Sequence, residues 1–152
     1  MKSILKCLLL AASVLMFHTA AVAADKGTAN EATALVKRAV DYMKANGKEK
    51  AFAEFNNPKG HFIDRDLYIF VFDMNGKTLA HGTNPKLLDK NMIDLKDADG
   101  KLFIKEFIEV ANTKGKGWVD YKWPNPLTKA IEPKSTYIEK AGDVLVGCGI
   151  YK

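Results

Sequence analysis

The chain has 152 residues, 47% of them hydrophobic and 27% charged, and its formal net charge is +5 at pH 7. This charge is too small and too evenly spread to indicate a nucleic-acid-binding protein. Beyond the N-terminus, no stretch approaches the roughly 20 consecutive apolar residues that a membrane helix needs. The sequence therefore predicts a globular domain that neither binds nucleic acid nor spans a membrane.

Residues 1–23 have the three parts of a secretory signal peptide. Lys2 and Lys6 form a positive start, residues 8–17 are apolar, and Ala21-Val22-Ala23 is a cleavage site of the A-x-A type. We therefore expect the mature chain to begin near residue 24 and to be periplasmic.

The remaining residues, 24–152, fit one domain with its own hydrophobic core. Losing Lys2 and Lys6 while keeping all 18 acidic residues would lower the net charge from +5 to +3. Cys7 precedes the apolar run, so we expect no lipid anchor. Cys148 would be the one cysteine left, which excludes an internal disulfide, and no Cys-x-x-Cys-His motif is present for covalent haem.

Two helices are predicted near the mature N-terminus. Thr28 and Glu31 have the spacing of a capping box, and a helix is predicted over residues 31–45, ending at Gly47. Its apolar stripe consists of Ala32, Leu35, Val36, Ala39, Val40 and Met43. A shorter helix follows over residues 48–55.

A hairpin is predicted next. Every residue from 67 to 72 is apolar or aromatic, so this strand should be covered on both faces. Residues 73–76, Asp-Met-Asn-Gly, are a turn signal, and residues 78–81 form the returning strand.

Residues 82–99 are predicted to be a long loop that packs against the domain through four apolar side chains, Leu87, Leu88, Met92 and Leu95. Asp99 is expected to cap a helix over residues 101–111. That helix buries Phe103, Phe107, Val110 and Ala111.

Three more strands are predicted at residues 117–123, 134–139 and 143–151. They are joined by turns at residues 125–129 and 141–142. Five antiparallel strands with helices before and between them make an α+β domain.

Several motifs in this order carry a family resemblance. The hairpin LYIFVFDMNGKTLAHGTNPKL is followed by Trp118-Val119-Asp120-Tyr121-x-Trp123-Pro124, then Pro133-Lys134-x-x-Tyr137, then Gly147-x-Gly149-Ile150-Tyr151. From about residue 32 to residue 151, the chain resembles the single Cache domain family. These are PAS-like, extracytoplasmic sensor modules of bacterial chemoreceptors and sensor kinases.

The resemblance implies a long N-terminal helix across a five-stranded antiparallel sheet, with a small-ligand pocket between the other face of the sheet and the loops. Members of this type bind short carboxylates such as acetate, propionate, lactate or pyruvate, and related Cache domains bind amino acids or other metabolites. A chemoreceptor has a membrane helix after this domain, whereas this chain ends at Lys152. We therefore expect a free-standing periplasmic member that acts through a membrane-bound sensor or transporter.

Lys134 matches the family lysine of the Pro-Lys-x-x-Tyr segment, and its ammonium group suits a carboxylate ligand. The alternative is an ordinary surface lysine. Tyr121 and Trp123 share a strand face with Val119 and are expected to form pocket walls or donate to the ligand, unless they only fill the core. Tyr137 has the same two interpretations.

His81 borders the pocket in the resemblance, where a neutral imidazole would donate to a carboxylate and its charge would make binding depend on pH. It could equally be an exposed turn residue. Tyr68 and Phe70 are expected to line the same cavity, although the sequence does not say which face of their strand packs on the helix. Arg65 is a candidate carboxylate clamp or a surface residue.

No metal site, cofactor or catalytic group is expected. Residues 97–100 with Glu106 fit only part of a calcium loop, because its first ligand position would be Leu95. The histidines have no metal-ligand spacing with Cys148, and there is no Ser-His-Asp order and no phosphate-binding loop. We interpret Cys148 as a buried, inert thiol rather than a redox or dimer cysteine.

The leading prediction is a periplasmic protein that binds a small organic acid without covalent chemistry, with the loop at 82–99 closing over the ligand. The alternative is a structural or interaction module with a vestigial pocket, forming a homodimer through the helix at residues 31–45.

Overall fold

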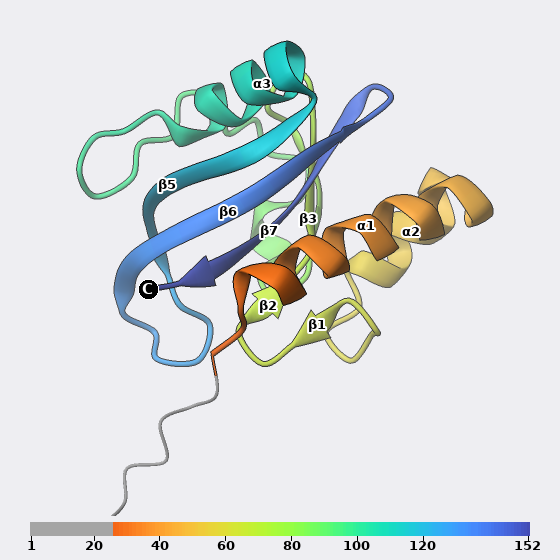
Figure 1. The fold of residues 1–152 in the computed structure, drawn as a ribbon, viewed down its shortest axis with the longest axis horizontal. Helices are drawn as coiled ribbons and strands as arrows, with labels where there is room; N and C mark the ends of the chain where they lie inside the picture. Colours follow the sequence, from red (N-terminus) through yellow and green to blue (C-terminus); the bar gives the residue numbers. More distant parts are fainter. Residues whose placement is uncertain (1–25) are drawn as a thin grey trace, which may run out of the picture.

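A computed structural model describes residues 26–152, so the signal peptide expected at residues 1–23 lies outside the described residues. Helices α1 (Ala29–Asn46) and α2 (Lys48–Phe55) lie on one side of a five-stranded antiparallel sheet. Helix α3 (Phe103–Lys114) packs against the other side (Figure 1). The α+β prediction is confirmed.

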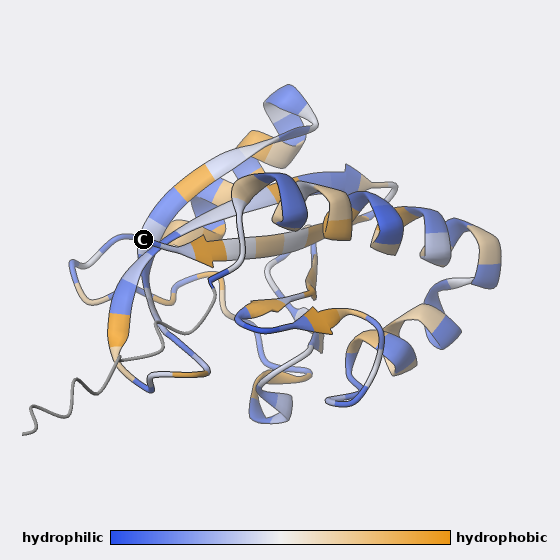
Figure 2. Ribbon diagram, turned by 60° about the horizontal axis from the view of Figure 1, so that its bottom comes forward, coloured by the Kyte–Doolittle hydropathy of each residue, from blue (hydrophilic) through white to orange (hydrophobic). Residues whose placement is uncertain are grey.

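The strands follow the order β4-β3-β7-β6-β5, so the last strand of the chain lies at the centre of the sheet. Their bounds are β3 (Phe70–Asp73), β4 (Thr78–His81), β5 (Lys116–Pro124), β6 (Ile131–Ala141) and β7 (Val144–Tyr151). Two short strands, β1 (Ile63–Asp64) and β2 (Leu67–Tyr68), form a separate pair, and η1 (Pro85–Leu87) is a single 3-10 turn. Figure 2 shows apolar residues on the central strands and polar residues on the outer sides of the helices.

The predicted capping box starts α1. The Thr28 side chain accepts a hydrogen bond from the Glu31 backbone N–H at 3.3 Å, and the Glu31 carboxylate accepts one from the Thr28 N–H at 2.7 Å. The helix is three residues longer than predicted, and its buried residues are the six of the predicted apolar stripe. The sequence pattern therefore determined both the start and the inward face of α1.

Replacing Thr28 by alanine should lower the free energy of unfolding by about 1 kcal/mol, because the Glu31 backbone N–H loses its acceptor. Urea denaturation measures this change. Thr33→Ala is a matched control in the same helix, since the Thr33 hydroxyl only bonds back to the Ala29 carbonyl. An equal decrease in the free energy of unfolding of both variants would show that loss of the helix cap does not cause the destabilisation.

The predicted strand at residues 67–72 is divided between β2 and β3, and all six of its residues are buried. Alternate residues face opposite sides. Leu67, Ile69 and Val71 pack in the cluster under α1 and α2, whereas Tyr68, Phe70 and Phe72 pack in the cluster under α3. This settles which face of the strand packs on the N-terminal helix.

The cap predicted for α3 is wrong. The helix begins at Phe103 without a side-chain cap. Asp97 rather than Asp99 is the acceptor, taking backbone hydrogen bonds from Asp99 and Lys101 at 2.9 Å each. These bonds form a turn that ends before the helix. The predicted buried residues of α3 are confirmed except for Val110, which is half-buried.

The loop at residues 82–99 is tied to the β3–β4 hairpin along the backbone. The Met92 N–H donates to the Gly76 carbonyl at 2.8 Å, and Thr78 exchanges hydrogen bonds with Lys90 and Asp89 at 2.9 and 3.0 Å. None of the helices found between residues 26 and 152 combines the length and apolarity needed to cross a membrane.

Candidate ligand-binding site

A cavity of about 20 Å³ lies between the sheet face opposite α1, helix α3 and the loop at residues 82–99. Its walls are mainly aromatic and aliphatic: Tyr68, Phe70, Phe72, His81, Leu87, Met92, Leu95, Phe103, Ile104, Phe107, Tyr121 and Trp123. Five of the predicted site residues, namely Tyr68, Phe70, His81, Tyr121 and Trp123, thus come together around one space. The volume corresponds to about one water molecule.

The Lys134 side chain is buried on this same face of the sheet, with 1% of its surface exposed. Its Nζ donates to the Tyr68 hydroxyl at 2.7 Å and to the Tyr151 hydroxyl at 3.2 Å. Nζ also lies 4.2 and 4.7 Å from the centroids of these two rings. Within residues 26–152, no carboxylate forms an ion pair with Lys134. Among the described residues, the hydrogen-bond partners of its ammonium group are these two phenol hydroxyls.

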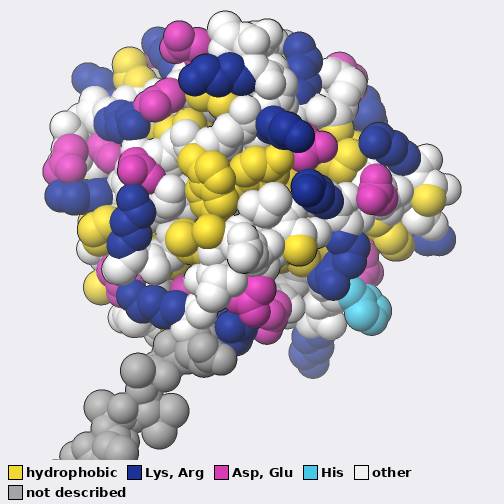
Figure 3. Space-filling model, in the orientation of Figure 1, with side chains coloured by type: hydrophobic (Ala, Val, Ile, Leu, Met, Phe, Trp, Pro, Cys, Tyr) yellow, Lys and Arg dark blue, Asp and Glu magenta, His cyan; other side chains and the backbone are white. Residues whose placement is uncertain are grey.

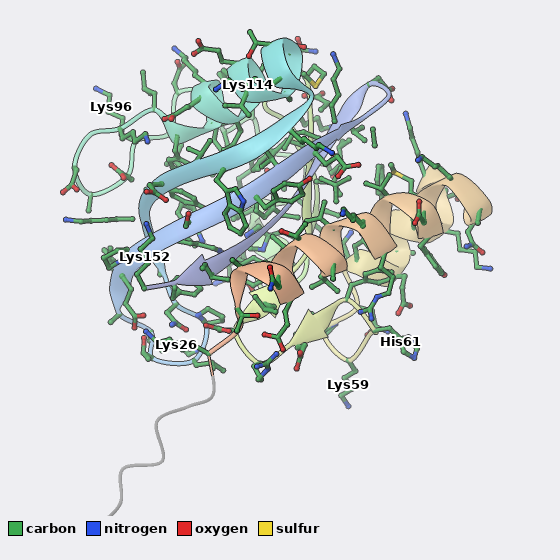
Figure 4. All side chains as sticks on the ribbon, in the orientation of Figure 1. Lys26, Lys59, His61, Lys96, Lys114 and Lys152 are labelled. Atoms are coloured by element: carbon green, nitrogen blue, oxygen red, sulfur yellow. The ribbon has the colours of Figure 1, made fainter. Side chains whose placement is uncertain are left out.

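The burial of Lys134 sets it apart from the other lysines. In Figure 4, Lys59, Lys96 and Lys114 project outward from the fold, and all three are exposed. Burial lowers the pKa of Lys134 to about 7, because the charged form loses its water, and the nearby Cys148 and Asp66 offset this only in part. At neutral pH the group is poised between its charged and neutral forms.

The strand register explains how a lysine fits here. Lys134 pairs with Tyr121 on β5 and with Tyr151 on β7, so the three side chains share one face. Gly149 lies beside the lysine stem, where an added Cβ would collide with Lys134 Cε and Thr136 Oγ1. The second glycine of the Gly147-x-Gly149 motif therefore makes room for the lysine.

Replacing Gly149 by alanine should cost about 1–3 kcal/mol of folding free energy, because the new methyl group overpacks the site. The midpoint of urea denaturation measures this cost. Ile150→Val, a change on the opposite face of the same strand, should cost less than about 1 kcal/mol. If the midpoint of Gly149→Ala equals that of the wild type, steric crowding at Gly149 is refuted.

His81 is also buried, at 4% exposed, and its ring lies 5.0 Å from that of Tyr68. Its Nδ1 accepts a hydrogen bond from the Asn84 backbone N–H at 3.1 Å, which places the proton of the neutral ring on Nε2. Burial and the charge of Lys134 lower the pKa of His81 to about 3. His81 is therefore a neutral donor near pH 7, whereas Lys134 is the group whose pKa lies near neutrality.

Tyr121 and Trp123 share a face with Val119, as strand alternation predicts. The Tyr121 ring stacks on Phe103 with centroids 4.3 Å apart, and its hydroxyl lies 3.1 Å from Thr136 Oγ1. Trp118 points to the opposite side of the sheet and is 40% exposed. Figure 3 shows apolar side chains gathered on that outer side, between α1 and β5.

Two predicted site residues lie elsewhere. Tyr137 faces α1, packs in the cluster under that helix and donates to the Glu139 carboxylate at 3.0 Å. Lys134 and Tyr137 are an odd number of residues apart on one strand, so they point to opposite faces. Arg65 lies in the turn between β1 and β2, where it pairs with Glu31 at 2.6 Å and Asp64 at 2.8 Å. Arg65 thus connects the start of α1, through Glu31, to the end of β1, through Asp64.

Tyr151 is the main residue that the sequence analysis missed. Its hydroxyl accepts from Lys134 and donates to the Pro124 carbonyl at 2.8 Å, which links the lysine to the end of β5. Alternation along β7 places Tyr151 on the face of Gly149 and opposite that of Cys148. The face of Tyr151 could therefore have been predicted from the sequence. Cys148 is buried as predicted, and burial raises its pKa to about 12.

Among residues 26–152, no group of histidine, cysteine or acidic side chains is arranged to hold a metal ion. The cavity is instead a small apolar space with a buried ammonium group, a neutral imidazole donor and phenol hydroxyls beside it. A small apolar space with a few polar groups at its edge is typical of small-ligand sites.

Comparison with known proteins identifies the family of the chain. The chain is 32% identical over 90 residues to the methyl-accepting chemotaxis protein McpP of Pseudomonas putida, a match over 58% of this chain and 16% of McpP. It is 34% identical over 89 residues to the sensor histidine kinase MctS of Rhizobium johnstonii, over 57% of this chain and 19% of MctS. The chain thus spans less than a fifth of these two relatives.

A crystal structure of a methyl-accepting chemotaxis protein from Vibrio parahaemolyticus has the same fold, with a TM-score of 0.70 and 27% identity over 80% of this chain and 86% of that chain. The family model for the single Cache domain 2 matches residues 4–152. The chain therefore belongs to the single Cache domain 2 family and is homologous to the sensor domains of chemotaxis receptors and histidine kinases.

Proposed function

We propose that this domain binds a short-chain carboxylate outside the cytoplasm and reports its presence to a membrane-bound signalling partner. One observation carries the proposal: the ammonium group of Lys134 is buried beside the cavity, and no described carboxylate pairs with it. A buried charge without a counter-charge is costly. A ligand carboxylate would supply the missing charge.

The chemistry of the walls supports an acid with a small apolar body. The carboxylate would bind near Lys134 and the Nε2–H of His81, with its alkyl end against Phe70, Phe103 and Phe107. None of the described residues that line the cavity is acidic, so the ammonium group of an amino acid would find no partner there. Polyols would leave most of their hydroxyls without hydrogen bonds against these walls.

The proposed location is the periplasm, in line with the signal peptide expected at residues 1–23 and with the family's use as an extracytoplasmic sensor. The matched relatives are a chemotaxis receptor and a sensor kinase, so the proposed partner is a membrane protein of these signalling classes. N-terminal sequencing of the exported protein should give a start near Ala24.

A thermal-shift screen tests the function. Acetate, propionate, lactate and pyruvate are compared with amino acids and polyols at equal concentrations. A ligand at 100 times its Kd adds about 2.7 kcal/mol to the free energy of unfolding, which raises the melting temperature by several degrees. A shift with amino acids or polyols but with none of the acids would refute carboxylate binding. If no compound has an effect and the protein is a dimer in sedimentation, the interaction-module alternative is favoured.

A further inference from the structure

The cavity is too small for the proposed ligand as it stands. Its volume of about 20 Å³ accommodates about one water molecule, whereas an acid with four or more heavy atoms needs several times this space. Part of the wall must therefore move when the ligand binds. The cavity has one wall formed by the sheet and α3 and another formed by the loop at residues 82–99, and their contacts differ.

The wall formed by the sheet and α3 is held in place by ring contacts. Phe70 stacks on Phe107 with centroids 5.7 Å apart, and Phe103 stacks on Tyr121 at 4.3 Å. Phe107 also meets Tyr121 edge to face at 5.4 Å. These four side chains are buried, at 7% exposed or less. Moving any of them would break several aromatic contacts at once.

The opposite wall comes from Leu87, Met92 and Leu95 of the loop, and all three are half-buried. The loop backbone is fixed near Met92, because the Met92 N–H donates to the Gly76 carbonyl and Asn91 Nδ2 donates to the Asn75 carbonyl at 3.2 Å. Space is therefore gained more readily by a side-chain movement than by opening the loop.

Met92 is suited to this movement by its covalent structure. Its side chain is unbranched, polarisable and has three rotatable bonds, so it changes shape at little cost. Leu87 and Leu95 are branched and have fewer rotamers. Because Met92 is half-buried, its side chain is able to turn outward to solvent and leave its volume to a ligand.

We propose that Met92 is the movable wall of the cavity and the residue that determines the length of the carbon chain that the domain accepts. This inference rests on the proposed function. An acid with a short chain displaces the methionine only slightly, whereas each further methylene group must displace more of it. The domain therefore selects short acids through the volume that Met92 occupies.

The test is calorimetric titration of the exported protein with acetate, propionate, butyrate and valerate. Met92→Ala should move the best ligand to an acid longer by one to three carbons, with affinity rising about fourfold per added methylene until the new space is filled. Met92→Ile, which is stiff at χ1, should weaken all four acids and the longer ones most. Ile93→Ala is the matched control, because Ile93 is the next residue of the loop and does not line the cavity.

The proposal is overturned if both Met92 variants keep the wild-type order of affinities, or if Ile93→Ala changes that order as much as Met92→Ala does. Met92→Ala is expected to favour longer acids and Met92→Ile to weaken them, so either variant tests the proposal if the other folds poorly. A wild-type protein that binds none of these four acids and neither lactate nor pyruvate refutes the proposed function, and the role of Met92 falls with it. A wild-type protein that binds acids while the Met92 variants behave like it refutes only the role of Met92.

Discussion

Replacing Lys134 by methionine should weaken carboxylate binding at least about 30-fold and at the same time make the protein more stable. The loss follows from removing the buried positive charge, since truncating one partner of such a charge pair costs about 2–5 kcal/mol. The gain in folding free energy, about 1–3 kcal/mol, follows because the ligand-free protein no longer buries an unpaired ammonium group. Calorimetry measures the first effect and urea denaturation the second.

Lys122→Met is the control for this prediction. Lys122 is on the neighbouring strand β5, but its ammonium group is accessible and pairs with Asp99 at 2.9 Å. Removing this surface ion pair should change the free energy of unfolding by less than about 1 kcal/mol and leave binding unchanged. A Lys134→Met variant that binds the acid as well as Lys122→Met does would show that the ligand is held elsewhere.

Carboxylate affinity should be constant below about pH 7 and fall by up to tenfold per pH unit above it. In the ligand-free protein the pKa of Lys134 is about 7, and a bound carboxylate raises it by favouring the charged form. Above pH 7, binding therefore takes up a proton that the free protein lacks. Titrations at pH 6 to 9, each in two buffers of different ionisation enthalpy, would detect this proton. Affinity that does not change across this range would contradict the prediction.

The same group should make the ligand-free protein more stable as the pH rises from 7 toward 10.5. In this window the unfolded chain binds a proton on Lys134, whose ordinary pKa is 10.5, and the folded protein does not. Below pH 7 Lys134 is protonated in both the folded and the unfolded state, so it no longer makes the free energy of unfolding depend on pH. His81, with its pKa lowered to about 3, should reduce stability only as the pH falls below 6.5. Lys134→Met should abolish the rise above pH 7.

Local patterns in the sequence predicted much of the fold. Thr28 and Glu31 determined the start of α1 because a capping box needs only residues three apart. The uninterrupted apolar run at residues 67–72 predicted a strand that is buried on both faces. The two-residue period of a strand placed Tyr121 and Trp123 on the face of Val119, and applied to β6 it would also have placed Tyr137 on the face opposite Lys134.

Other features depended on segments that are distant in the sequence. Arg65 forms an ion pair with Glu31, which is 34 residues away in the sequence. No local pattern distinguishes an arginine with this structural role from one that binds a ligand carboxylate. The sequence predicted a helix cap at Asp99, whereas the structure has a turn around Asp97 and no side-chain cap on α3, and the two aspartates have the same side chain. The tertiary structure decided between them, since Asp97 also accepts the Lys122 backbone N–H from β5.

The sequence by itself determined the family, the secondary structure and the face that most side chains take on their strands, because these depend on local spacing and on ordered motifs. Only the tertiary structure decided that Tyr68 and Phe70 face the cavity, that Tyr151 holds Lys134, and that the cavity is small. The physical reason is that burial is a property of the packed layers. A lysine has the same local pattern on a surface strand or a central one, and its environment exists only when β5, β6 and β7 are paired and the loop covers them.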